Sequence, residues 1–193
     1  MLNKKWIIFL IVVLTLTLSG CTSNTSPNVN DKNNNNQDKN NKDTNISNTS
    51  VVYEDIKITP EKAFAIFIGK YPNTKVKKIE LDFEQGAYVY QVEGYDNTKE
   101  YELKINPING NILREEQDDL ANNQGEITIE DVKKIQELVN KALGDAGNNY
   151  KVDEWTLKLQ NDQTIFSIEV VNDKNHDIEY KFNVNTGELI EKD

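Results

Sequence analysis

The sequence has little of what most catalytic and metal centres are built from. It contains one cysteine and one histidine in 193 residues. One cysteine excludes an intramolecular disulfide, and one histidine excludes centres that need several imidazole groups. The motifs of serine hydrolases, zinc peptidases and phosphate-binding loops are missing as well. We therefore expect no catalytic residues, no metal ion and no cofactor, and we predict that the protein is not an enzyme.

Positive charge is also scarce. The chain has 22 Lys and Arg side chains against 32 Asp and Glu side chains, which gives a net charge of −10. The excess lies in residues 51–193, which hold 29 acidic and 17 basic residues. A surface of this sign repels phosphate backbones, so the composition argues against nucleic-acid binding.

No apolar run in the sequence is long enough for a spanning helix. Residues 6–18 are thirteen residues, apolar except for two threonines, and two lysines precede them. As a helix this run is about 20 Å long, whereas the hydrocarbon core of a bilayer is about 30 Å thick. Residues 1–20 are therefore predicted to be an export signal peptide that is removed.

The segment Leu18-Ser19-Gly20-Cys21 resembles the lipobox of bacterial lipoproteins. The resemblance implies cleavage between Gly20 and Cys21, and a diacylglycerol group on the Cys21 sulfur atom. Two or three acyl chains, such as palmitate, anchor a protein stably. We therefore expect the protein on the extracellular face of the bacterial cell membrane, held to the lipid bilayer through Cys21. The alternative is an ordinary signal peptide followed by an incidental cysteine.

Residues 21–50 are predicted to be a tether. Residues 22–50 include eleven asparagines, and Val29 and Ile46 are their only large apolar side chains. A segment of this composition buries too little apolar surface to offset its conformational entropy. We therefore expect a disordered spacer that starts at the lipidated cysteine.

The rest of the chain contains an internal repeat. Matching segments occur in the same order, at offsets of 69 to 77 residues: 58–61 with 127–130, 79–83 with 155–159, 90–93 with 166–169, and 106–113 with 183–190. We therefore predict two tandem repeats, at residues 51–119 and 120–193. The polar residues 115–125 are interpreted as the link between them.

Each repeat is predicted to begin with a helix. In the first repeat Thr59 is placed as the N-cap, and Pro60 occupies the first turn. Apolar residues then follow at the spacing of one helical face, at Ala63, Ile66, Phe67 and Tyr71.

The second predicted helix has the stronger pattern. Thr128 and Asp131 have the spacing of a capping box. The apolar period then runs through residues 132–143, which predicts one continuous helix that ends at Gly144 or Gly147.

After each helix the apolar period changes to two residues. The alternating residues are Ile79, Leu81, Phe83; Tyr88, Tyr90, Val92; and Tyr101, Leu103, Ile105 in the first repeat, and Trp155, Leu157, Leu159; Phe166, Ile168, Val170; and Ile178, Tyr180, Phe182, Val184 in the second. A short apolar pair closes each repeat. Alternation and short spacers predict antiparallel strands with one buried face. The fold class is therefore α+β, with two α-β-β-β-β repeats, each a helix packed on an antiparallel sheet. Because each core is thin, we expect the repeats to pack on each other.

Both repeats resemble the PepSY domain family. The resemblance rests on a Thr-x-Glu helix start, a strand that ends in Tyr-x-Val, and a closing turn of the form Asn-x-x-x-Gly-x-Ile. These motifs stand at residues 59–61, 90–92 and 106–112, and in related form at residues 128–130, 166–168 and 183–189.

The resemblance implies a cystatin-like fold for each repeat and a non-catalytic role. PepSY domains occur in peptidase propeptides and in exported or lipid-anchored proteins of Gram-positive bacteria. We therefore predict an anchored extracellular module that binds an exported protein and inhibits or modulates a protease or a cell-wall hydrolase. The alternative is a structural or assembly subunit of a cell-envelope complex without inhibitory action.

Two weaker site hypotheses concern polar and aromatic residues. His176 lies in a predicted hairpin and is interpreted as an exposed turn residue. The spacing of Asp173, Asn175, Asp177 and Glu179 matches the first positions of a calcium loop, but the alternation that follows predicts a strand, which would spread these side chains apart.

The aromatic residues Trp155, Tyr88 and Tyr90 could form a binding strip. Their strand spacing favours a place in the core.

We expect the binding surface at strand edges and hairpins, because unpaired edges accept an extended segment of a partner. The hairpins concerned are Gln85-Gly86, Gly94–Thr98 and Asn172–Asp177. The faces of the helices are not expected to take part, and the junction between the repeats is the next candidate.

Overall fold

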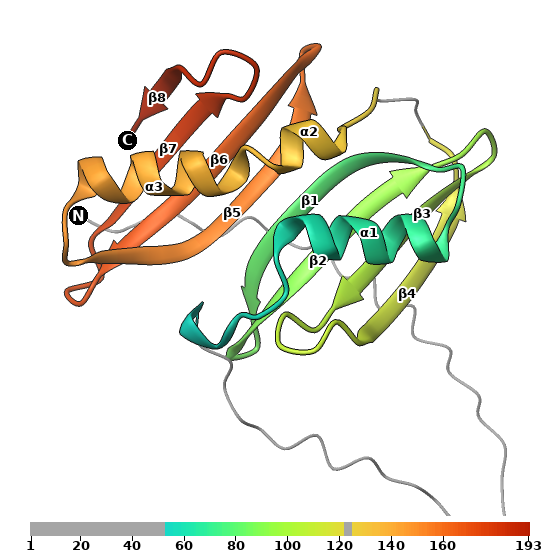
Figure 1. The fold of residues 1–193 in the computed structure, drawn as a ribbon, viewed down its shortest axis with the longest axis horizontal. Coiled ribbons are helices and arrows are strands. Elements are labelled where there is room, and N and C mark those ends of the chain that lie inside the picture. Colours follow the sequence, from blue (N-terminus) through green and yellow to red (C-terminus); the bar gives the residue numbers. More distant parts are fainter. Residues whose placement is uncertain (1–52, 122–124) are drawn as a thin grey trace, which may run out of the picture. The chain divides into compact units, whose positions relative to one another are not determined.

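The structure is one eight-stranded antiparallel sheet with helices on one of its faces (Figure 1). It is a computed structural model that describes residues 53–121 and 125–193. The predictions for the signal peptide, for Cys21 and for the tether lie outside the described residues. Among the residues described, no helix is both long enough and apolar enough to span a bilayer.

The described residues follow the predicted order of elements. The helical segments are η1 (Tyr53–Asp55), α1 (Pro60–Lys70), α2 (Ile129–Val132) and α3 (Ile135–Ala146). The strands are β1 (Lys75–Glu84), β2 (Ala87–Tyr95), β3 (Lys99–Ile105), β4 (Ile112–Asp119), β5 (Tyr150–Gln160), β6 (Gln163–Asn172), β7 (Asp177–Asn183) and β8 (Leu189–Lys192). Their order in the sheet is β4-β3-β2-β1-β5-β6-β7-β8. The predicted α+β class and the antiparallel sheet are confirmed.

Helix α1 begins where the sequence predicts. The Thr59 hydroxyl accepts the N–H of Lys62 at 3.4 Å, and Pro60 occupies the first turn. Proline costs nothing there because that N–H has no partner inside a helix. Ala63 and Phe67 are fully buried, so the face predicted to be apolar is the face that packs on the sheet.

The second predicted helix is interrupted, so the prediction of one continuous helix was wrong. The capping box of Thr128 and Asp131 is present and starts α2, but α2 ends at Val132. The Lys134 N–H then donates to the Asp131 carbonyl oxygen at 3.1 Å, which is the tighter bond of a 3₁₀ turn. Helix α3 starts one residue later and ends at Gly147, the second of the two predicted ends. The tighter turn keeps both Val132 and Ile135 in the core.

Strands β1 and β5 join the two parts of the sheet. We call residues 53–119 the N-terminal half, residues 127–193 the C-terminal half, and the pairing of β1 with β5 the seam. Ile79 pairs with Leu157, and Leu81 pairs with Trp155. The two halves therefore pack edge to edge in one sheet, with a shared apolar layer beneath the helices.

The seam has a local twofold symmetry. At the sequence offset of 76 residues, Ile79 corresponds to Trp155, and Leu81 corresponds to Leu157. Each strand thus contributes the same two positions to the pairing, as in an isologous interface. The axis passes through the pair Glu80 and Thr156, where the Thr156 hydroxyl donates to a Glu80 carboxylate oxygen at 3.3 Å.

The two halves also carry the same irregularities. One bulge lies between residues 76 and 78 in β1, and another lies between residues 152 and 154 in β5. The turns before β4 and β8 are alike, because Asn106 and Asn183 each accept two backbone N–H bonds through the side-chain oxygen. Gly110 and Gly187 follow with positive φ angles of 76° and 71°. The two halves therefore share a bulge and a closing turn at corresponding positions.

Strand β4 is longer than the sequence predicts. Residues 115–119 were interpreted as part of a polar link, but they pair with β3 as far as the couple Lys99 and Asp119. The Lys99 ammonium lies 2.7 Å from the Asp119 carboxylate, and the Lys70 ammonium on α1 lies 2.9 Å from that of Glu115. Cross-strand and helix contacts thus hold a polar edge strand that shows no apolar alternation.

Two further predictions were wrong in detail. Phe83, expected on the buried face, is 46% exposed at the end of β1. Gly94, expected in a hairpin, lies inside β2 beneath α1. A Cβ atom there would be 2.6 Å from the Lys75 carbonyl oxygen and 2.7 Å from the Phe67 ring. The glycine therefore permits the close approach of the helix.

The aromatic residues that could have formed a binding strip belong to the core. Trp155, Tyr88 and Tyr90 are 3%, 7% and 2% exposed. The Trp155 ring packs against Tyr90 across the seam, with ring centroids 5.9 Å apart. The interpretation as core residues is confirmed.

Candidate functional site

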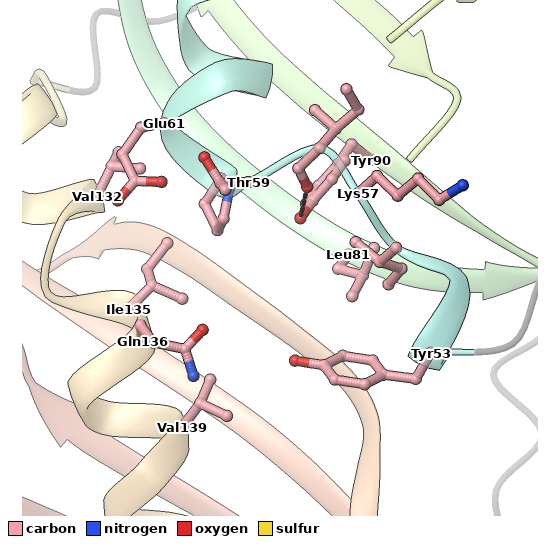
Figure 2. Close-up of a pocket in the computed structure, with 13 residues that line it drawn as sticks. Tyr53, Lys57, Thr59, Glu61, Leu81, Tyr90, Val132, Ile135, Gln136 and Val139 are labelled. Carbon is pink, nitrogen blue, oxygen red and sulfur yellow. Dashed lines mark hydrogen bonds between the residues drawn. The ribbon is translucent and has the colours of Figure 1, made fainter. Parts of the chain in front are cut away.

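A groove lies between the helices of the two halves, above the seam (Figure 2). We call it the inter-helix groove; its volume is about 340 Å³. One wall is the start of α1 with Thr59 and Glu61, and the other wall is the buried face of α2 and α3. The groove therefore sits at the junction between the halves, which the sequence analysis ranked after the hairpins.

The groove has an apolar interior and a polar rim. Leu81 and Val139 line its interior, while Glu61 and Gln136 stand on opposite walls of it. Figure 2 shows the Tyr53 ring directed across the groove toward α3. Such a lining suits apolar side chains of a bound segment whose polar atoms face the rim.

A buried hydrogen bond fixes the shape of the groove. The Tyr90 hydroxyl donates to the Ile58 carbonyl oxygen at 2.9 Å, which ties the segment before α1 to the sheet. Burial, with the nearby Tyr53 and Glu61, raises the pKa of Tyr90 far above its ordinary value. The hydroxyl therefore stays protonated and available as a donor to the Ile58 carbonyl oxygen at physiological pH.

The described residues do not form a metal site or a nucleophilic centre in the groove. In the part of the chain that the structure describes, no group of three or more His, Cys, Asp and Glu side chains could hold a metal ion. The groove presents one carboxylate, one ammonium group, hydroxyls, an amide and aliphatic groups. These groups suit recognition of a peptide.

A second hollow lies at the end of the seam formed by Phe83 of β1 and Lys151 of β5, where two of the three predicted hairpins meet. We call it the hairpin hollow; its volume is about 470 Å³. Phe83 and Tyr88 come from the β1–β2 hairpin, and Asn172 and Asp173 come from the β6–β7 hairpin. The other residues that line it are Tyr53, Glu54, Lys151, Asp153, Val171 and Asn175. Both hairpins are predicted from the sequence as binding surfaces, but their proximity follows only from the pairing of β1 with β5.

The third predicted hairpin is a tightly bonded turn at the other end of β2. Asp96 accepts the backbone N–H groups of Thr98 and Lys99 at 2.7 and 2.9 Å, and the Tyr101 hydroxyl at 2.8 Å. These bonds hold the pKa of Asp96 well below its usual range. Its carboxylate therefore serves the turn, and the structure does not bring this hairpin to the other two.

His176 is an exposed turn residue, as predicted. Its backbone N–H donates to the Asn172 side-chain oxygen at 3.1 Å. Strand β7 starts at Asp177, as the alternation predicted, so the calcium-loop spacing falls partly on a strand.

The face of the sheet opposite the helices is covered with charged side chains. Lys78 makes ion pairs with Glu80 and Glu93 at 2.8 and 2.7 Å. At the other end of the seam, burial and the neighbouring Asp82 raise the pKa of Glu154 to about 7. Acidic side chains therefore outweigh basic ones where the seam approaches the hairpin hollow.

Comparisons with known proteins agree with this architecture. The crystal structure of a "putative lipoprotein" from Clostridium difficile 630 superimposes on this chain with a TM-score of 0.54. The two are 22% identical, and the superposition covers 72% of this chain and 93% of the other. At that identity the likeness is one of fold. No curated protein sequence matches the chain.

The family comparison concerns the N-terminal half. Residues 57–116 match the PepSY family, described as the peptidase propeptide and YPEB domain. The match begins just before α1 and ends inside β4, so it contains one wall of the inter-helix groove. The chain is therefore similar to the PepSY family over most of its N-terminal half.

Proposed function

We propose that the protein is a membrane-anchored extracellular binding module that inhibits or modulates an exported protease or a cell-wall hydrolase. The inter-helix groove would receive an extended segment of that enzyme. PepSY domains are in general non-catalytic propeptide or regulatory modules, and the region similar to them supplies the α1 wall of the groove. That coincidence is the observation that carries the proposal.

The proposal includes a second PepSY-like module in the C-terminal half, with both modules cystatin-like. The matching bulges, the matching Asn–Gly turns and the twofold pairing at the seam support this duplication. The groove then lies between two modules of one kind, and its two walls are corresponding helices.

Anchoring through Cys21 remains part of the proposal. Its supports are the lipobox-like residues 18–21 and a structural neighbour described as a "putative lipoprotein". An anchored binding module would meet exported enzymes at the outer surface of the membrane.

Site-specific cross-linking in intact cells tests the groove. A photo-reactive amino acid at Gln136, inside the groove, should capture the partner, because its side chain lies against the bound segment. The same amino acid at Glu137 is the matched control, since this next residue of α3 is outside the groove and pairs with Lys141. Capture of a peptidase or cell-wall hydrolase from Gln136 alone supports the proposal.

A second measurement separates inhibition from mere binding. Gln136→Trp fills the groove at an exposed position and should relieve inhibition of the captured enzyme, whereas Glu137→Trp should not. Capture of a membrane assembly without hydrolytic activity would favour the alternative role as a structural subunit. Equal capture from both positions would exclude the groove as the binding site.

A further inference from the structure

The hairpin hollow has an uncovered aromatic floor. Phe83 is 46% exposed, and its ring centroid lies 5.1 Å from that of Tyr88. Tyr53 also packs against Tyr88, with centroids 5.8 Å apart. The Tyr88 hydroxyl donates to the Val152 carbonyl oxygen at 3.1 Å, so the middle ring is fixed to β5. Three linked rings therefore form a rigid shelf with one accessible end.

The corresponding position in the C-terminal half is covered. At the offset of 76 residues, Phe83 corresponds to Leu159. Leu159 lies against Gly125 of the connection between the halves, since a Cβ atom on Gly125 would be 3.2 Å from its side chain. Leu159 is half-buried, whereas Phe83 is exposed, so the aromatic residue stands at the more exposed end of the seam.

Carboxylates surround the shelf without cationic partners. Glu54, Asp153 and Asp173 line the hollow, and none of them forms an ion pair with any residue that the structure describes. Lys151 is the only cation among the described residues that line it. Burial, followed by the charge of Asp153, raises the pKa of Tyr88. The local field is therefore negative at the aromatic surface.

We propose that the hairpin hollow binds a lysine or arginine side chain presented by a partner protein. Such a side chain lays its aliphatic stem and its cationic head on an aromatic ring, and carboxylates at the rim complete the recognition. The proposal goes beyond the function proposed above, because it holds whether or not the partner is an enzyme. The bound side chain is expected to be a cation because the hollow is lined by three carboxylates and one ammonium group.

The test uses the full chain in a non-ionic detergent at low ionic strength, with N-acetylarginine amide as the probe. N-acetylcitrulline amide has nearly the same shape without the charge and serves as the control ligand. Binding is followed by NMR chemical shifts. We expect the arginine probe to shift the signals of residues 83–88 and 172–175, and the citrulline probe to leave them unchanged.

Of three variants, two should weaken binding of the arginine probe and one should strengthen it. Asp153→Asn should weaken arginine binding by about two- to fivefold, the range for one exposed ion pair. Phe83→Ala should weaken it by a similar factor through the lost cation–π contact. Lys151→Gln should strengthen binding, because it removes the one repulsive charge. Melting temperatures of the three variants show that each is folded.

Any one of four results with these probes and variants would overturn the proposal. They are equal binding of citrulline, weaker binding to Lys151→Gln, unchanged binding to Asp153→Asn, and no detectable binding of arginine. Displacement of the probe by calcium ions at matched ionic strength would also overturn it, since the hollow would then be a divalent-cation site.

Discussion

Exchanging two charges within β5, one at each end of the seam, should make the protein more stable. The register sets Lys158 opposite Lys78, and one step beyond the paired stretch the negative charge of Asp82 acts on Glu154. Like charges thus oppose each other at both ends of the seam. The double variant Glu154→Lys with Lys158→Glu reverses both pairs and leaves the net charge and the composition unchanged.

The size of the gain follows from cross-strand pairs. Opposite charges across an antiparallel pair stabilise by about 0.2–1 kcal/mol, and like charges destabilise by similar amounts. The side chains are on the solvent face, where screening reduces these values, so we expect about 1 kcal/mol for both ends together at low salt. For a domain of this size that is a rise of about 3 °C in the melting temperature.

Urea unfolding followed by the fluorescence of Trp155, which is buried at the seam, measures the gain. The gain should nearly vanish at about 1 M salt, where charges are screened within a few ångströms. It should also be smaller at pH 5 than at pH 8, because Glu154, with a pKa of about 7, is protonated at pH 5 and no longer repels Asp82. A double variant no more stable than the natural chain, or a gain indifferent to salt, would refute the reasoning.

Four other expectations concern stability and location. Gly94→Ala should destabilise by about 2 kcal/mol in urea melts, because its methyl group meets backbone and the Phe67 ring, whereas Gly69→Ala, in an open helical position, should stabilise by about 0.5 kcal/mol. The pKa of Glu154 is raised in the folded state, so between about pH 4.5 and 7 the native state binds more protons than the unfolded chain. The natural protein should therefore lose stability as the pH rises through this window, and Glu154→Gln should abolish that loss. Cys21→Ser should release the protein into the medium or leave it unprocessed, and mass spectrometry of the mature N-terminus checks the lipid. A chain that starts at residue 51 should melt within about 2 °C of the longer one, because residues 22–50 bury almost no apolar surface.

Local sequence signals predicted the elements well. The caps at Thr59 and Thr128 and the alternating strands depend on neighbours within a few residues, and the structure contains them. The failures also have local causes. The 3₁₀ turn at Lys133 and Lys134 leaves the apolar period intact, and the acidic end of β4 forms a strand through pairing with β3, which no alternation announces.

The candidate sites were beyond local signals. The inter-helix groove and the hairpin hollow both exist because β1 pairs with β5, and that pairing joins residues about 76 positions apart. The repeat itself predicted two similar halves, but it did not predict which edges meet. Which edges pair depends on how much apolar surface residues such as Leu81 and Trp155 bury, and that burial exists only in the assembled sheet.

The symmetry of the seam allows the charges along β1 and β5 to be compared with those at the interface of a symmetric dimer. If two identical N-terminal halves paired about the same axis, Lys78 of one would lie opposite Asp82 of the other, and two identical C-terminal halves would bring Glu154 opposite Lys158. Each seam strand is thus complementary in charge to a copy of itself, which is the property of a homodimer interface. Within one chain the two strands meet each other, and their like charges are opposed. The seam is therefore held by its apolar layer, against charges that favour the pairing of each strand with a copy of itself.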